Sequence, residues 1–118
     1  ATRRLLEKHT TDLPEVIFGT TKMEKDNTYT LTKSYKKFRY LFFMYSPLES
    51  LNVVNTMIFP VRFVKEGVRN QFAFTVNISN TSTARAQIGL MSETTFGVQA
   101  VSGEGTYPDM YVRICGIR

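Results

Sequence analysis

The chain has 118 residues, of which 42% are hydrophobic and 21% are charged, and its formal net charge is +5. This length and composition are typical of one globular domain and exclude a mostly disordered chain. No apolar run approaches the roughly 20 residues of a membrane-spanning helix, so we expect no membrane insertion, and the scattered Lys and Arg residues form no block that would indicate a nucleic-acid partner.

Residues 1–14 are interpreted as a lead-in segment that precedes the folded domain. The opening Arg3-Arg4-Leu5-Leu6 lacks the apolar core and the cleavage site of a secretory signal. Leu13 precedes Pro14, and the residue before a proline is biased away from helix. We therefore place a single domain at residues 15–118.

Short runs of β-branched and aromatic residues follow, separated by Gly, Asn, Asp, Ser and Pro, with no helical period. We expect eight strands, at 15–21, 27–32, 38–45, 55–64, 71–78, 84–91, 95–101 and 109–118. Regularly spaced short strands predict an all-β fold, an antiparallel β-sandwich of about eight strands.

Two of these runs show the alternation of a half-buried strand. In the run 71–78, one face carries Phe72, Phe74, Val76 and Ile78, and polar or small residues share the other. The run 55–64 alternates in the same way. However, Pro60 has no N–H to donate to a neighbouring strand, which predicts an edge position or a bulge.

The run 38–45 differs because both of its faces are apolar after Arg39. One face suits the core, and the other needs a cover that a two-layer sandwich does not supply. We therefore predict that Leu41, Phe43 and Tyr45 form a subunit interface. The alternative is that both faces are covered within the chain.

Catalytic and metal-binding motifs are missing from the sequence. Its one histidine, His9, lies in the lead-in, and its one cysteine, Cys115, lies in an apolar run near the end of the chain. Neither a nucleophile–base arrangement nor a zinc-ligand cluster can be composed from them. We expect no catalytic residue, no metal, no cofactor and no enzymatic activity. Cys115 is interpreted as a small buried hydrophobic residue, the alternative being a reactive or intermolecular thiol.

The order of strands also sorts the loops between the two ends of a sandwich. If every strand traverses it, connections 22–26, 46–54, 79–83 and 102–107 share the far end, opposite the entry at Glu15. Loops on a rigid β scaffold commonly carry binding residues. The candidate receptor-binding residues at this end are Lys25, Asp26, Leu48, Glu49, Asn52, Asn80, Thr81, Glu104 and Tyr107. The basic connections 33–37 and 65–70 fall at the entry end, where we expect solvation, the alternative being docking to whatever precedes the domain.

The order of features, from a strand ending in Gly19 through Tyr29-Thr30-Leu31-Thr32 to the ending Ile114-Cys115-Gly116-Ile117, resembles the C-terminal receptor-binding tip domains of bacteriophage tail fibres. The resemblance covers roughly residues 17–118. It implies a homotrimer of β-sandwiches at the distal end of a fibre in the virion, which adheres to a bacterial surface polysaccharide or outer-membrane protein. Arg39 departs from the pattern, which favours an acidic or small polar residue there.

Receptor binding is thus the first functional hypothesis. The second is a structural virion protein, such as a small jelly-roll capsid, decoration or baseplate component. The third is a non-catalytic carbohydrate-binding module. The chain has no tryptophan for sugar stacking, so Tyr45, Tyr107 and Tyr111 would have to serve.

Overall fold

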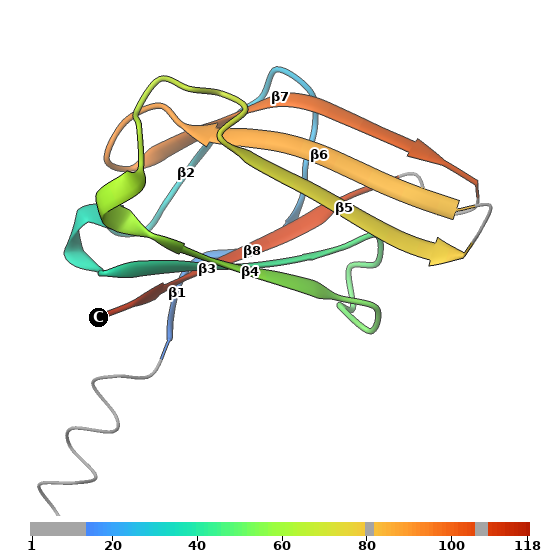
Figure 1. Cartoon of the computed structure of the whole chain (residues 1–118), viewed down its shortest axis with the longest axis horizontal. Coiled ribbons are helices and arrows are strands. Elements are labelled where there is room, and N and C mark those ends of the chain that lie inside the picture. Colours follow the sequence, from blue (N-terminus) through green and yellow to red (C-terminus); the bar gives the residue numbers. More distant parts are fainter. Residues whose placement is uncertain (1–13, 80–81, 106–108) are drawn as a thin grey trace, which may run out of the picture.

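The computed structural model describes residues 14–79, 82–105 and 109–118, and within them the chain is a β-sandwich. Eight strands form two four-stranded antiparallel sheets that face one another (Figure 1). The predicted fold class is confirmed, and each predicted strand has a counterpart. Of the lead-in, only Pro14 lies within the described residues.

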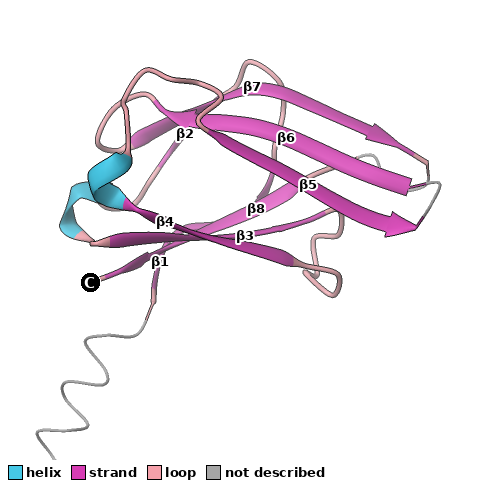
Figure 2. Cartoon of the chain, in the orientation of Figure 1, coloured by secondary structure: helices cyan, strands magenta, loops and turns pink. Residues whose placement is uncertain are grey.

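The first sheet, called sheet I, has the strand order β1-β8-β3-β4. Its strands are β1 (Glu15–Lys22), β8 (Tyr111–Ile117), β3 (Tyr40–Ser46) and β4 (Asn55–Pro60). Sheet II has the order β2-β7-β6-β5. Its strands are β2 (Thr28–Thr30), β7 (Thr95–Glu104), β6 (Ser82–Leu90) and β5 (Phe72–Ser79). Two short 3-10 turns, η1 (Tyr35–Lys37) and η2 (Val61–Phe63), lie at one end of the sandwich (Figure 2).

Pro60 has the effect that the sequence predicts, because β4 is an edge strand of sheet I and ends at this proline. The predicted continuation of the strand to residue 64 is wrong. Val61–Phe63 instead turn as η2, and Phe63 is exposed rather than buried in the alternation. A residue that cannot donate to the ladder ends pairing on that side, and the chain is free to turn there.

Aromatic side chains fill the space between the two sheets. The ring of Phe43 on β3 lies 4.7 Å from that of Phe72 and 5.4 Å from that of Phe74, both on β5. Tyr45 stacks on Phe74 at 4.4 Å, and Phe59 meets Phe72 edge-on at 4.9 Å. Each of these rings contributes roughly 1.5–3 kcal/mol when fully buried, so this cluster fixes how the two sheets face one another.

A second aromatic cluster lies at the other side of the sandwich, between β1 and sheet II. Phe18 contacts Phe96 at 4.8 Å and Tyr29 at 5.7 Å, both edge-on. Tyr29 stacks on Phe96 at 5.3 Å, and its hydroxyl donates to the carbonyl of Lys22. The β2 strand, which has three residues, is held in place by this cluster and by its pairing with β7.

The C-terminal run Ile114-Cys115-Gly116-Ile117 is explained by packing. Ile114 points into the core, and Cys115 is buried as expected, which raises the pKa of its thiol. Gly116 lies under the ring of Phe38, where an added Cβ would come within 2.4 Å of ring carbons. Only glycine lets this ring lie against β8.

We predict that Gly116→Ala lowers the free energy of unfolding by about 1–3 kcal/mol, because the Phe38 ring must move away from the new methyl group. Gly19→Ala is the matched control in β1, since a Cβ there meets nothing within 4 Å. Urea denaturation measures both variants. Equal free energies for the two variants would contradict this account of the C-terminal run.

Candidate binding surfaces

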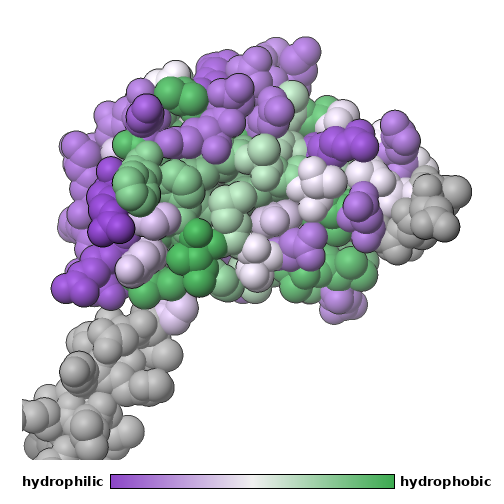
Figure 3. All heavy atoms as spheres, in the orientation of Figure 1, coloured by the Kyte–Doolittle hydropathy of each residue, from purple (hydrophilic) through white to green (hydrophobic). Residues whose placement is uncertain are grey.

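The outer faces of the two sheets differ in chemistry. On sheet II, the side chains that point outward are small or polar and exposed. They include Ala73, Thr75, Asn77, Arg85 and Gln87. In Figure 3, hydrophilic residues accordingly cover the upper side of the molecule, over sheet II, whereas hydrophobic ones reach the surface along the lower side. Sheet II therefore needs no cover other than water.

The outer face of sheet I carries apolar side chains from all four strands. The strand registers place Val16, Cys115, Phe42 and Ile58 in one row from β1 to β4. Val16 is 50% exposed and Ile58 is 58% exposed. A second row, closer to the start of β3, contains Ile117, Tyr40 and Pro60. We call these two rows the outer apolar face.

The predicted subunit-interface residues lie on the wrong side of β3. Leu41, Phe43 and Tyr45 are buried in the core of their own chain and are not available to a neighbour. The opposite face of the strand carries Tyr40, which is 42% exposed, and Phe42, which is partly buried. Since side chains alternate along a strand, the aromatic contacts of Phe43 and Tyr45 with β5 decide which face is internal.

The β3–β4 loop carries Leu48, Glu49 and Asn52 at the end of the sandwich where β5 and β7 also finish (Figure 1). Glu104, the last residue of β7, lies at this same end. The structure therefore brings four of the predicted site residues to one end. Glu49, Asn52 and Glu104 are exposed there, and Leu48 is partly buried.

This loop is a fixed turn. The N–H of Leu48 donates to Ser46 Oγ at 2.9 Å, and the N–H of Leu51 donates to the carbonyl of Leu48 at 3.0 Å. Leu51 has a φ of 59°, a conformation that is unusual for a bulky residue and tends to occur where the surroundings enforce it. The loop also exposes Val53 and Val54, which the sequence analysis did not single out.

Connection 22–26 leaves sheet I at the same end as the β3–β4 loop, because Lys22 and Ser46 both pair with Tyr111 of β8. Asp26 nevertheless lies far from Glu104. The Asp26 N–H donates to the carbonyl of Val98, and Val98 donates in return to the carbonyl of Asn27. Val98 precedes Glu104 by six residues on β7, or about 20 Å along a strand. The strand count therefore assigns this loop to the correct end of sheet I, but the three-residue β2 leaves Asp26 short of the tip of β7. The remaining site predictions, Asn80, Thr81 and Tyr107, fall outside the described residues.

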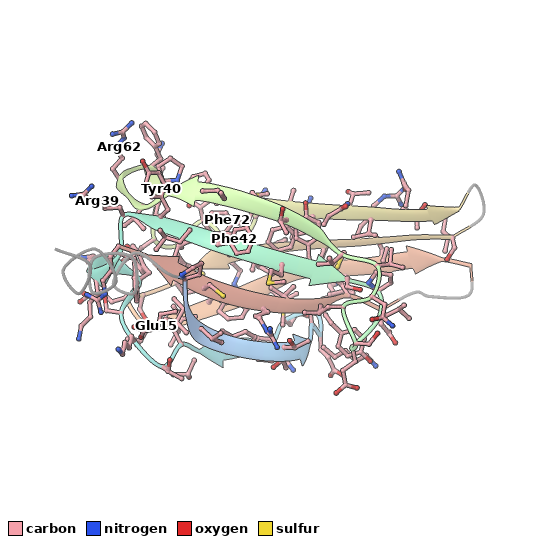
Figure 4. All side chains as sticks on the ribbon, turned by 90° about the horizontal axis from the view of Figure 1, so that it is seen from below. Glu15, Arg39, Tyr40, Phe42, Arg62 and Phe72 are labelled. Carbon is pink, nitrogen blue, oxygen red and sulfur yellow. The ribbon has the colours of Figure 1, made fainter. Side chains whose placement is uncertain are left out.

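A hollow of about 510 Å³ lies at the opposite end, between the start of β3 and η2. Its walls are formed by Phe38, Arg39, Tyr40, Pro60, Val61 and Arg62. Figure 4 shows Arg39 and Arg62 at this end of sheet I, with Tyr40 beside them. Sequence reasoning missed the hollow because it treated Arg62 as part of a strand and Arg39 only as a departure from the family pattern.

The acidic groups at this end have partners other than these two arginines. Glu15 binds Lys33 at 2.6 Å and Arg118 at 3.8 Å, and the Lys33 hydrogen bond holds the pKa of Glu15 below its ordinary value. Glu66 accepts a hydrogen bond of 2.7 Å from the hydroxyl of Tyr35, whose pKa is raised to about 12 by burial and by this carboxylate. Within residues 14–79, 82–105 and 109–118, Arg39 and Arg62 have no ion pair.

No family model, no curated protein and no solved structure matches the chain. None of the helical segments among the described residues has the length and hydrophobicity of a membrane-spanning helix. Among the same residues, no group of three or more His, Cys, Asp and Glu side chains is placed so that it could hold a metal ion. The candidate surfaces therefore rest on the geometry of this chain.

We predict that Phe43→Ala lowers the free energy of unfolding by about 3–5 kcal/mol at every protein concentration, because it leaves a cavity between the sheets. Phe42→Ala, on the other face of the same strand, lowers it by about 1 kcal/mol or less in dilute solution. Urea denaturation over a range of protein concentrations separates the two. A larger loss for Phe42→Ala in dilute solution would contradict the assigned faces.

Proposed function

We propose that this chain is a non-enzymatic receptor-binding domain at the distal tip of a bacteriophage tail fibre. It assembles as a homotrimer and attaches the virion to a bacterial surface polysaccharide or outer-membrane protein. The observation that supports this proposal best is the contrast between the two outer faces of the sandwich. One face carries open rows of apolar side chains, as an assembly surface would, while the other is polar.

The assembly part of the proposal uses the outer apolar face. Val16, Phe42 and Ile58 belong to three different strands and lie in one row, so a flat neighbour can cover them together. Burial of each side chain contributes up to about 1.5–3 kcal/mol. Three copies around one axis each present this face to a neighbour, which removes the apolar patch from water.

The adhesion part uses the β3–β4 loop and the end of β7. Glu49, Asn52 and Glu104 offer hydrogen-bonding groups, and Val53 and Val54 offer apolar contact beside them. A turn held by its own hydrogen bonds loses little conformational entropy when it binds. Three linked copies raise the effective concentration for each further contact, so a weak single site suffices for adhesion.

The apolar face also suits the second hypothesis, a structural virion protein in which this face is a lattice contact. The third hypothesis, a carbohydrate-binding module, needs tyrosines that stack on sugars, and one of the three candidates is not available. Tyr45 is buried and stacked on Phe74, so it has no face left for a sugar. Tyr111 is partly buried, and Tyr107 lies outside the described residues.

The proposed function is tested by mass measurement of the purified chain together with its binding to whole bacterial cells of a panel of strains. We expect the mass of three chains and saturable binding to at least one strain. Ile58→Lys, in the outer apolar face, gives single chains whose apparent affinity for cells falls about 10²-fold or more, because avidity is lost. Thr75→Lys adds the same charge to the outer face of sheet II and leaves both properties unchanged.

A chain that is monomeric and binds no strain would refute the proposal. A chain that assembles but binds no strain would leave the structural virion protein as the better account. Loop variants test the binding end separately. Glu49→Ala combined with Asn52→Ala weakens cell binding at least about tenfold without a change in mass or in unfolding, whereas Thr75→Ala has no effect. Undiminished binding by the loop variant would overturn the placement of the receptor site.

A further inference from the structure

The backbone around the hollow of Arg39 and Arg62 is fixed by direct hydrogen bonds. The N–H of Arg39 donates to the carbonyl of Ile117 at 2.8 Å, and its carbonyl accepts from the N–H of Val61 at 2.8 Å. The Val61 bond links the start of β3 to η2, the turn that contains Arg62. The two arginines therefore project from segments that are bonded to one another, and little backbone order has to be gained when a ligand binds.

The charge in the hollow is positive and uncompensated. Both arginines are exposed, and the structure assigns the nearby carboxylates Glu15 and Glu66 to other partners. In the described part of the chain, neither guanidinium has an ion pair. A guanidinium is planar and offers paired N–H donors that match a carboxylate or a phosphate group.

An aromatic ring and a proline lie beside these charges. Tyr40 is 42% exposed, pairs with Pro60 across the β3–β4 ladder, and lines the hollow together with it. Arg62 also lies over the ring of Phe63, with its guanidinium carbon 4.9 Å from the ring centre. Such a combination of cations and an exposed tyrosine suits a ligand that has both an acidic group and a flat apolar face, as a sugar ring has.

We propose that the hollow binds an acidic sugar unit, with its carboxylate or phosphate held between Arg39 and Arg62 and its ring against Tyr40. The volume of about 510 Å³ lies in the range of small-ligand sites. This inference rests on the proposed function, because it narrows the receptor to an anionic surface polysaccharide. It also adds a second contact point, since the hollow and the β3–β4 loop lie at opposite ends of sheet I (Figure 4).

The site is compatible with assembly through the outer apolar face. The row Val16, Phe42 and Ile58 lies farther along the strands than Tyr40 and Pro60, which form the edge of that face. Figure 4 shows both labelled arginines projecting beyond the end of sheet I, away from that row. A neighbour that covers the row leaves the guanidinium groups at its rim, open to a polysaccharide.

The experiment uses the full chain and three defined probes in calorimetric or NMR titrations. Tetragalacturonate supplies a carboxylate, glucose 1-phosphate supplies a phosphate, and maltotetraose is neutral. We expect at least one acidic probe to bind and the neutral probe not to bind, and we expect binding to weaken as salt rises. Arg39→Gln and Arg62→Gln each weaken it about tenfold or more, since each removes charge-assisted hydrogen bonds. Arg85→Gln, on the outer face of sheet II, is the matched control and leaves it unchanged.

Several outcomes would overturn the inference. These are the absence of binding by both acidic probes, equal binding of the neutral probe, and acidic binding that persists in the Arg39→Gln and Arg62→Gln double variant. The relative affinities of the two acidic probes decide between carboxylate and phosphate. Failure of the proposed function can be distinguished from failure of this inference. A chain that binds an acidic probe through these arginines but adheres to no cell would support the site and refute the adhesion role.

Discussion

The packing of Phe43 between Phe72 and Phe74 is the interaction on which the rest of the molecule depends. It joins sheet I to sheet II at the centre of the sandwich, and it decides which face of β3 is internal. Once Phe43 points inward, the alternation of the strand sends Phe42 outward. Val16 and Ile58 are paired with that row through the strand registers and are placed on the outside with it. The outer apolar face is therefore a direct consequence of the core.

The C-terminal strand connects the core to the arginine hollow. Phe38 lies on Gly116, and the next residue, Arg39, is bonded through its backbone to Ile117 and Val61. Gly116 thus lets the Phe38 ring close this end of the core. Arg39, the residue after Phe38, is held at the wall of the hollow. Arg118 also lies over the Phe38 ring, with its guanidinium carbon 5.2 Å from the ring centre, and it pairs with Glu15. The C-terminal run therefore has a structural role at this end of the sandwich, and that role does not depend on which partner the hollow binds.

Much of the fold could be predicted from the sequence because most strands have one polar face and one apolar face. The alternation around Phe72 and the edge position of the strand that contains Pro60 followed from elementary strand geometry. The internal face of β3 could not be predicted, since both of its faces are apolar and only contacts with β5 distinguish them. Counting strands predicted the end at which the loop of Lys25 and Asp26 leaves sheet I. It could not predict that the three-residue β2 keeps Asp26 about 20 Å from Glu104 along β7. The hollow depends on a turn after Pro60 that brings Arg62 close to Arg39, and no local pattern signals that approach.

The central claim is that copies of this chain cover the row of Val16, Phe42 and Ile58 in the outer apolar face. Hydroxyl-radical labelling of the native assembly, compared with the Ile58→Lys chain, measures this directly at Phe42. Tyr29 on sheet II serves as the internal reference, because it is partly exposed on the other side of the sandwich. The account predicts that labelling of Phe42 rises several-fold in the variant while that of Tyr29 stays constant. Equal labelling of Phe42 in both samples would show that the face is open in the native protein, and would contradict the claim.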